Sequence, residues 1–395
     1  MVKHPTFASF FCGCGGLDLG FEQAGFSGLN AYDIDSDAVA VHNHNLKTRA
    51  HVCDLTQTSF RKSRIVRPDV VIAGPPCQGF STLGKRLLDD PRNSLVLTAA
   101  TLAVQHQPQV IVLENVAGAM SGQHATYWHA AERVISNAGY QLVTQQLVSA
   151  DYGIPQVRRR VVLIAWKSKS KTAPVISLGT RVTLGSTLRS LEGVGNHEPK
   201  HLKHGSDEYS IATRIKPHQK LCNVRGGDRA VPTWEIPNVF GKTTTIERNM
   251  LVMIQKLRRQ LRRRDHGDAD PLSLSQIAEH CGRDASTTIM QLLTKGYVRK
   301  LGQRFDLAHA FNGKYRRLAW EHVAPAVDTR FGEPRYFLHP EEHRGLSVRE
   351  AARIQSFPDD FDFTGPRAAQ FRMVGNAVPP MLARQIALAI RDQLL

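Results

Sequence analysis

Short apolar runs alternate with helical patterns over the first 166 residues, and this alternation constrains the fold more than any other feature. Val70–Ala73 and Val110–Glu114 are rich in β-branched residues and have the length of buried strands. Ser94–Gln105 lies between them and Trp128–Asn137 follows, each with the character of a helix. Because strands that alternate with helices imply right-handed crossovers, we predict an α/β fold with a doubly wound, mostly parallel sheet.

A different pattern begins after Trp166. A basic linker opens it, and the residues that follow are polar and irregular, with frequent Gly, Pro and His. A periodic helix closes the sequence at Met381–Leu395. We therefore predict a main domain of residues 1–166 plus 368–395 and a second, smaller domain of residues 167–367.

The net charge limits the kind of partner. Lys and Arg total 51 against 35 acidic residues, which gives a net charge of +16 and a pI near 9.8. An excess of this size favours a polyanion as partner. No apolar run approaches the ~20 residues of a membrane span, and no signal peptide is evident. We expect a cytoplasmic protein with no membrane partner.

The cysteines are spread along the chain and form no Cys-x-x-Cys pair, so we expect reduced thiols and no metal site. Cys77 follows Pro75 and Pro76 directly, at the end of the strand Val70–Ala73. The two prolines stiffen the backbone there. The thiol could pack in the core as a small hydrophobe. It could also be a nucleophile held at the carboxyl edge of the sheet, where α/β folds place their sites.

A glycine-rich turn, Phe11–Leu17, lies between the first strand and the first helix. Glycines let a ligand approach the backbone, and the start of a helix offers unpaired N–H groups. Asp33 ends the second strand, where an acid can accept from ribose hydroxyls, and Asp54 could accept from the amino group of adenine. The spacing is not Gly-x-Gly-x-x-Gly, so a single nucleoside with a short charged tail fits better than a dinucleotide.

Charged residues lie beside two further strands. Glu114 ends an apolar strand, where a carboxylate is costly without a partner. Arg158 and Arg160 precede the strand Val161–Ala165, and alternation points them to one face and Arg159 to the other. Each of these residues could instead belong to a structural ion pair.

Together these residues resemble one family, the C5-cytosine DNA methyltransferases of the bacterial restriction–modification type. The motifs occur in the family's order on both sides of one variable segment and cover roughly half of the chain. The matching stretches are Phe11–Leu17, Asp33, Asp54, Gly74–Gln78, Arg92-Asn93, Glu114–Val116, Gln156–Arg160, Arg349–Pro358 and Gly375–Pro380. The resemblance implies a class I S-adenosylmethionine-dependent methyltransferase fold for the main domain and a target-recognition role for the second.

The resemblance also implies the chemistry. Cys77 would add as a thiolate to C6 of a cytosine flipped out of duplex DNA, which activates C5 toward a methyl group. Glu114 would contact the N3/N4 edge of the base, and Arg158 and Arg160 would hold its O2. The loop Gln78–Asn93 would close over the flipped base.

S-adenosylmethionine is the cofactor that the resemblance implies. Two departures from the usual pattern are present: Asp33 stands in place of a glutamate, and Cys12 and Cys14 stand in place of small or aliphatic residues. Neither change removes a required functional group. The matching cofactor positions are Phe11, Cys12, Gly13, Gly15, Gly16, Leu17, Asp33, Ile34, Asp54, Leu55, Pro76, Asn376 and Ala377.

Part of the variable segment, residues 247–320, resembles a winged helix-turn-helix. Helices are predicted at Glu247–Arg264, Ser273–His280 and Ala285–Lys295, and a β-wing at Tyr297–Ala308. We expect this module to contact DNA; docking to a protein and a purely structural insertion are the alternatives. The predicted DNA contacts of the whole chain are Gln78, Ser81, Lys85, Arg86, Arg92, Arg225, Arg258, Arg262, Arg263, Thr287, Thr288 and Gln291.

The predicted function is therefore site-specific methylation of cytosine C5 in double-stranded DNA. We expect a monomer on DNA, with a cognate restriction or phage-defence system as a further partner. Two alternatives remain open at this stage. One is a relative that methylates RNA, although the Cys-Phe-Thr element usual in those that act on transfer RNA is not found. The other is a DNA-binding regulator that uses the winged helix.

Overall fold

The computed structural model describes residues 4–57, 67–76, 94–167, 172–263, 269–281 and 284–395. The chain forms two compact units. Unit 1 comprises Met1–Glu198, Trp320–Thr329 and Ser347–Leu395, and unit 2 comprises Pro199–Ala319 and Arg330–Leu346. These limits differ from the predicted domain boundaries, because residues 172–198, 320–329 and 347–367 belong to unit 1.

A seven-stranded sheet forms the centre of unit 1, in the order β3-β2-β1-β4-β5-β8-β6. The predicted α/β class with a mostly parallel sheet is confirmed; β8 alone runs antiparallel to its neighbours in this sheet, β5 and β6. β6 was not predicted from the sequence. The chain turns back after β6, so that β8 runs in the opposite direction. The strands are β1 (Thr6–Phe10), β2 (Ser27–Asp33), β3 (Ala50–Val52), β4 (Val70–Ala73), β5 (Val110–Val116), β6 (Gln141–Val148) and β8 (Arg159–Trp166).

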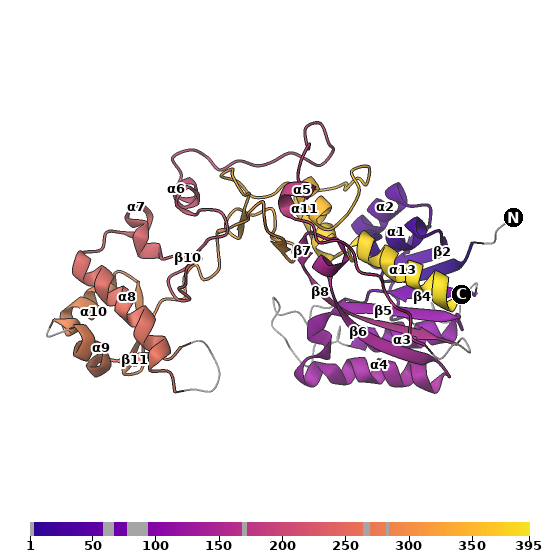
Figure 1. The fold of residues 1–395 in the computed structure, drawn as a ribbon, viewed down its shortest axis with the longest axis horizontal. Coiled ribbons are helices and arrows are strands. Elements are labelled where there is room, and N and C mark those ends of the chain that lie inside the picture. Colours follow the sequence, from indigo (N-terminus) through magenta and orange to yellow (C-terminus); the bar gives the residue numbers. More distant parts are fainter. Residues whose placement is uncertain (1–3, 58–66, 77–93, 168–171, 264–268, 282–283) are drawn as a thin grey trace. The chain divides into compact units, whose positions relative to one another are not determined.

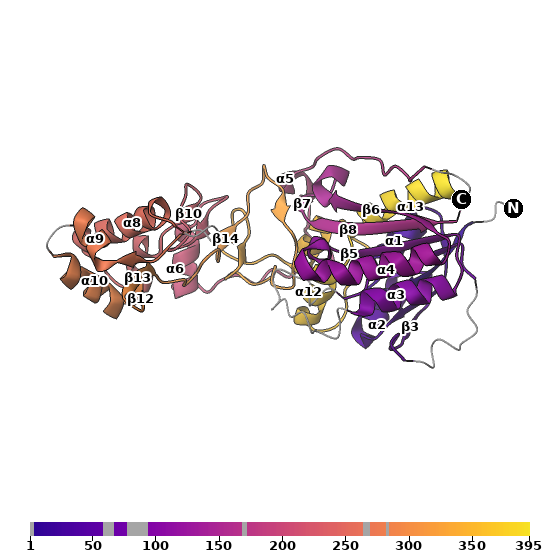
Figure 2. The same ribbon diagram turned by 90° about the horizontal axis from the view of Figure 1, so that it is seen from below.

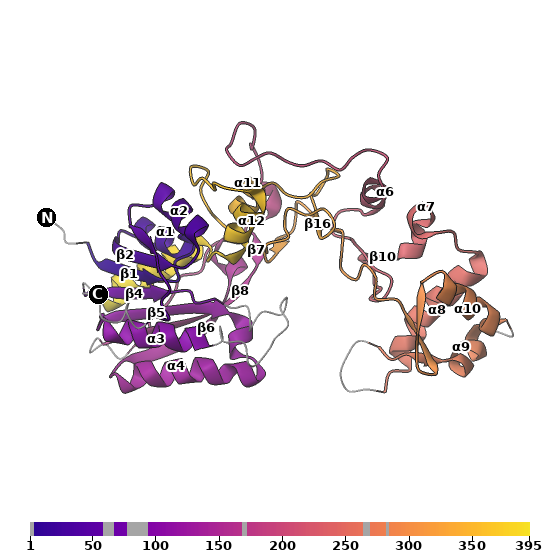
Figure 3. The ribbon, with the colours of Figure 1, turned by 180° about the vertical axis from the view of Figure 1, so that it is seen from behind.

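Helices cover both faces of this sheet (Figures 1 and 3). Alternate residues of each central strand point to opposite faces: Val70 and Ile72 pack toward α1 and α13, whereas Val71 and Ala73 pack toward α3 and α4. Fully burying such a side chain stabilises the fold by about 1.5–3 kcal/mol. The helices of unit 1 are α1 (Gly16–Gln23), α2 (Ser36–Asn45), α3 (Leu95–Gln105), α4 (Ala125–Asn137), α5 (Leu184–Thr187), α11 (Val348–Ile354), α12 (Arg367–Asn376) and α13 (Pro380–Leu394).

Short elements complete both units. In unit 1, β7 (Gln156–Val157) pairs with β15 (Ala324–Pro325). The 3₁₀ turns there are η3 (Ala117–Met120), η4 (Gly122–His124) and η5 (Ser149–Tyr152). Unit 2 contains α6 (Asp207–Arg214), β9 (Lys220–Leu221), β10 (Ala230–Val231), η6 (Thr233–Glu235), α7 (Pro237–Phe240), β14 (Arg316–Arg317) and β16 (Phe337–Leu338).

A separate small core in unit 2 is built by the segment predicted as a module. Three helices pack against a three-stranded antiparallel sheet of order β11-β13-β12 (Figure 2). Leu251, Ile254, Ile277, Ile289 and Leu292 are buried in this core. The elements are α8 (Thr245–Gln260), β11 (Leu272–Ser273), α9 (Leu274–Cys281), α10 (Ala285–Thr294), β12 (Val298–Leu301) and β13 (Arg304–Leu307). We call these elements the α8–β13 module.

None of the helices in the described ranges is both long and apolar enough to cross a lipid bilayer.

Candidate active site

Loops after three neighbouring strands meet at the carboxyl edge of the sheet in unit 1. β4 pairs in parallel with both β1 and β5, so the segments that follow these strands start side by side. The amide of Gly74 donates to the carbonyl of Phe10 at 3.2 Å. A Cβ on Gly74 would lie 3.8 Å from Oε2 of Glu114 and 3.9 Å from the carbonyl oxygen of Phe11. The glycine turn, the start of the loop that leads to Cys77 and the Glu114 carboxylate are therefore neighbours at this edge of the sheet.

The cysteine itself lies outside the described residues. The structure describes the chain as far as Pro76, which is half-buried and three residues from the end of β4. The predicted lid contacts also lie outside the described residues: Gln78, Ser81, Lys85, Arg86 and Arg92.

The glycine turn has an unusual backbone. Phe11, Gly13 and Gly15 have positive φ angles of 55°, 54° and 93°. Such a φ is rare for a bulky residue like Phe11 and is costly, so it commonly marks a functional constraint. A Cβ on Gly13 would meet no atom within 4 Å, whereas one on Gly16 would lie 2.3 Å from the carbonyl oxygen of Val378. Gly13 thus faces open space, while Gly16 allows the turn to pack against the C-terminal segment.

Asp33 lies directly beside this turn. Its Oδ2 accepts from the amide of Gly13 at 2.8 Å, and its Oδ1 accepts from the amide of Asp35 at 2.9 Å. Burial raises the pKa of Asp33, although these amide donors act in the opposite direction. The next residue, Ile34, is 67% exposed, which presents a large apolar surface at the edge of the same loop.

The other predicted cofactor positions divide by burial. Asp54 is near the surface, and hydrogen bonds from Thr56 lower its pKa. Cys12, Leu17 and Leu55 are buried. Burial is also the main cause of a raised pKa at the Cys12 thiol.

Glu114 pairs with Arg160 in a nearly water-free setting. The distance from Nε of Arg160 to Oε1 of Glu114 is 2.6 Å, and both side chains are nearly buried. Burial raises the pKa of Glu114, and the charges of Arg160 and Arg158 oppose that rise without cancelling it. The partner that a carboxylate at this strand end requires is therefore Arg160.

Arg158 does not have the free guanidinium that binding a base would need. It is buried, and it donates to the carbonyls of Val327 at 2.8 Å, Gly375 at 3.0 Å and Ala377 at 2.9 Å. Alternation predicted that Arg159 faces away from Arg158, and Arg159 is exposed, but alternation could not show that Arg158 is engaged by the C-terminal segment. The structure thus corrects the prediction: Arg158 is a structural anchor, and Arg160 is the arginine at the carboxylate.

Two buried glutamines extend this anchor. Nε2 of Gln156 donates to the carbonyl of Ile354 at 3.0 Å and to Oε1 of Gln355 at 2.6 Å. Gln355 in turn donates to the carbonyl of Val374 at 2.6 Å. Arg158 and this glutamine pair fix the turn at the end of α12, where Asn376 is exposed and Ala377 is half-buried.

A buried polar cluster of Ser9, Asp18 and His42 lies next to the glycine turn and was not predicted from the sequence. Asp18 in α1 accepts from Oγ of Ser9 at 2.9 Å and contacts Nε2 of His42 in α2 at 3.2 Å, and all three are fully buried. A Cβ on Gly15 would lie 2.8 Å from the imidazole of His42. This cluster therefore packs against the glycine turn at Gly15. An acid within the apolar stretch Leu17–Phe21 was the signal in the sequence.

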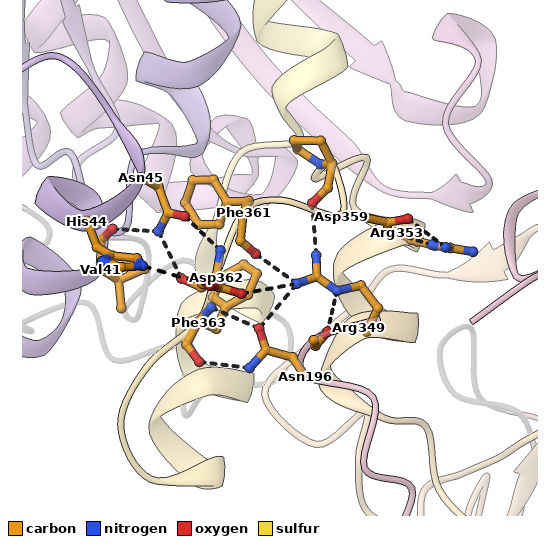
Figure 4. Close-up of polar contacts among 12 residues, drawn as sticks. Val41, His44, Asn45, Asn196, Arg349, Arg353, Asp359, Phe361, Asp362 and Phe363 are labelled. Carbon is orange, nitrogen blue, oxygen red and sulfur yellow. Dashed lines mark hydrogen bonds and ion pairs between the residues drawn. The ribbon is translucent and has the colours of Figure 1, made fainter. Parts of the chain in front are cut away.

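The Arg-Glu-Ala-Ala-Arg motif is also structural at its first position (Figure 4). Arg349 is completely buried and donates to the carbonyls of Gly195 and Pro358 at 2.8 Å and of Phe361 at 2.9 Å. Asn45 of α2 joins the same region, because it exchanges two hydrogen bonds with the backbone of Asp362. The motif thereby ties the segment 358–363 to the half of unit 1 that holds the glycine turn.

Comparisons with known proteins agree with this geometry. The family model for C-5 cytosine-specific DNA methylase matches residues 5–392. This chain belongs to that family. It is 33% identical to the type II methyltransferase M.XorII of Xanthomonas oryzae, over 99% of this chain and 87% of that protein. It is 30% identical to M.AgeI of Thalassovita gelatinovora, over 96% and 98% of the two chains. The predicted DNA (cytosine-5)-methyltransferase is thereby confirmed.

A solved structure shows the same fold. The methyltransferase EhMeth of Entamoeba histolytica aligns with a TM-score of 0.57 and 14% identity, over 100% of this chain and 99% of that chain. At that identity the likeness concerns the fold alone.

The methylase's glycine turn fits the cofactor of a methyltransferase. Gly13 borders open space, the Asp33 carboxylate lies beside it, and Ile34 offers an exposed apolar surface. An adenosine group needs these three features: room next to the backbone, an acceptor for hydroxyls and a surface for the base. The residues present are therefore compatible with S-adenosylmethionine.

Two of the residues predicted to contact DNA in unit 2 are buried, so those two predictions are wrong. Arg258 is buried and forms an ion pair with Asp306, because the last turn of α8 packs against β13. Thr288 is buried beside Ile289 and Leu292 on the inner face of α10. Arg225, Arg262, Arg263, Thr287 and Gln291 are exposed.

Proposed function

We propose that this methylase attacks C6 of a flipped cytosine with the thiolate of Cys77 and transfers a methyl group to C5. The observation that carries the proposal is the buried Glu114–Arg160 pair beside Gly74, where the strand that leads to Cys77 ends. A duplex hides C6, so the base must leave the stack before a sulfur can reach it. Duplex DNA is the proposed substrate, and the net charge of +16 suits it.

Each residue has one proposed part. The thiolate adds to C6, and the electron pair displaced toward C5 makes that carbon a nucleophile. Glu114 faces the N3/N4 edge of the base and stabilises the ring as N3 gains a proton. Arg160 holds the base oxygen and keeps the Glu114 carboxyl oriented. Loss of the C5 proton then expels the thiolate and restores the aromatic ring.

S-adenosylmethionine supplies the methyl group when it is bound at the glycine turn. We assign its adenosine to Phe11, Gly13, Asp33, Ile34 and Asp54, and its remaining contacts to Pro76 and Asn376. The anchor formed by Arg158 holds the turn that carries Asn376 and so acts on the cofactor site indirectly. The proposed partner besides DNA is a cognate restriction or defence system, and the proposed active species is a monomer on DNA.

Mapping 5-methylcytosine in plasmid DNA from a methylation-free host tests the proposal. Expression of the wild-type chain should place 5-methylcytosine at one short sequence motif, and expression of Cys77→Ala should place none. Modified bases other than 5-methylcytosine, or methylation that Cys77→Ala retains, would contradict the assignment.

A further inference from the structure

The exposed face of α10 is uncharged, in contrast to the chain as a whole. Its inner face is buried by Ala285, Thr288, Ile289 and Leu292. The opposite face carries exposed residues at the spacing that places them on adjacent turns. They are Ser286, Thr287, Met290, Gln291 and Thr294. α10 is described in full, and none of its residues is charged.

Met290 makes this face unusual. Its side chain is 51% exposed at the middle of α10, although an apolar side chain of this size gains free energy by burial. Gln291 lies next to it, and Thr287 lies one turn earlier. The face therefore combines a methyl-bearing apolar group with an amide and a hydroxyl.

Cations lie on the elements that contact this helix. α8 and β12 both pack against α10. Arg262 and Arg263 follow the end of α8 and are exposed, as are Lys300 and Arg304 in the wing. The amide of Arg263 donates to Asp270 at 2.8 Å, and Arg304 donates to the carbonyl of the next residue, Pro271, at 3.0 Å. The backbone of Arg263 and the guanidinium of Arg304 therefore both lie beside residues 270–271.

Ion pairs connect the elements of the module. Nζ of Lys295, just after α10, contacts both carboxylate oxygens of Glu247 in α8 at 2.8 and 2.9 Å. Arg258 near the end of α8 pairs with Asp306 of β13, and Arg299 of β12 reaches the same carboxylate at 2.8 Å. Lys295 thus ties the end of α10 to α8, and the other two pairs tie β13 to α8 and to β12.

An uncharged helix face in a module that also carries exposed cations matches the way DNA is read. Phosphates are contacted by Arg and Lys, whereas base edges are recognised by hydrogen bonds and methyl contacts in the major groove. Gln pairs with N6 and N7 of adenine, and an apolar side chain contacts the methyl group of thymine. Guanine is usually read by Arg or Lys, and cytosine by Glu or Asp, none of which occurs in α10.

We propose that the exposed face of α10 reads A·T base pairs in the sequence that this enzyme methylates. Gln291 contacts the adenine, Met290 contacts the thymine methyl group, and Thr287 assists as a neutral donor and acceptor. The exposed cations at the end of α8 and in β12 and β13 contact the phosphates. The inference rests on the proposed function and specifies which bases unit 2 of the enzyme selects.

Selection of bound duplexes tests this inference separately from catalysis. The full chain is incubated with randomised DNA duplexes, and bound sequences are determined for wild type, Gln291→Ala, Met290→Ala and Gln291→Arg. Wild type should enrich a motif containing at least one A·T pair. Gln291→Ala should lose roughly tenfold or more of its preference at one such pair. Gln291→Arg should shift that position toward guanine.

Asn249→Ala is the matched control, since Asn249 is an exposed amide of α8 outside the proposed face. It should leave the enriched motif unchanged. An unchanged motif in all three α10 variants, or relaxation only at G·C pairs, would overturn the inference and leave a protein partner as the role of this face. The 5-methylcytosine map of the wild type is a separate readout: its absence would contradict the proposed function and leave the binding result interpretable.

Discussion

The carboxyl edge of the sheet in unit 1 and the α8–β13 module of unit 2 both contain basic residues, but in opposite environments. In unit 1, Arg158 and Arg349 are buried and donate to backbone carbonyls. In the module, most of the described basic residues near the end of α8 and in β12 and β13 are exposed, whereas Arg258 is buried. A run of arginines in a sequence therefore does not reveal which members bind a ligand and which hold the fold.

The difference follows from the cost of burying a guanidinium. A buried arginine must satisfy its donors within the protein, and removing one partner of a buried pair leaves an uncompensated charge. An exposed arginine contributes little to stability but keeps its charge available to phosphates. Substitutions in the two regions should therefore separate chemistry, stability and DNA affinity.

The largest effect is expected at Cys77. Cys77→Ala should reduce methyl transfer to background while the affinities for cofactor and DNA stay within a few-fold of wild type, because the thiolate acts in the chemical step. Wild type should also form a covalent adduct with DNA that contains 5-fluorocytosine, since fluorine cannot leave C5 as the proton does. Transfer of labelled methyl groups by Cys77→Ala, or no adduct with wild type, would sink the thiolate mechanism.

The next effect concerns the stability of the module. Arg258→Gln should lower its free energy of unfolding by about 3–5 kcal/mol, because Asp306 would lose a buried partner. Urea titration followed by tryptophan fluorescence, to which Trp234 in the module core contributes, measures this change. Arg262→Gln is the matched control and should leave the midpoint unchanged. Equal midpoints for the two variants would remove the distinction between buried and exposed arginines.

Glu114→Gln should slow the single-turnover rate about 10²–10³-fold with little change in DNA affinity, because the amide cannot carry the charge that stabilises the protonated ring. Glu192→Gln, an exposed site in unit 1, is the control and should react like wild type. A loss confined to DNA affinity would assign Glu114 to positioning.

The pH dependence of the wild-type rate tests the same carboxylate. Burial raises the pKa of Glu114. The proposed mechanism uses the ionised carboxylate, because its charge stabilises the protonated ring. The rate should therefore fall as pH falls through the raised pKa, at a pH above the ordinary glutamate value of about 4.3. This loss should be missing from the profile of Glu114→Gln, and a profile identical to that of wild type would exclude Glu114 as its source.

The smallest effect is expected on the salt dependence of binding. Replacing Arg262 and Arg263 by glutamine should weaken binding to all duplexes alike and reduce the slope of log affinity against log salt by about one unit per lost phosphate contact. Affinity for one duplex over a series of salt concentrations measures it. Unchanged slopes would mean that these exposed arginines do not reach DNA. Buried and exposed arginines would then differ only in their effect on the free energy of unfolding.

Particular residues show how far the sequence could lead. The strands Val70–Ala73 and Val110–Glu114 were predictable because unbroken β-branched runs of that length are typical of buried parallel strands. The glycine turn and Asp33 followed from their places after strands. β6 was missed because its polar and apolar residues do not form such a run, and with it the reversed direction of β8.

The sequence by itself determined the fold class, the family and the order of the motifs, because these depend on local periodicity and on residue types at fixed spacings. Only the tertiary structure decided which similar residues do different work. In the structure, Arg160 pairs with the Glu114 carboxylate, whereas Arg158 donates to the backbone of the C-terminal segment. Arg258 and Thr288 are buried, and Met290 is exposed. The reason is physical: burial and partners depend on residues distant in the chain, such as Gly375 and Asp306, which no local pattern contains.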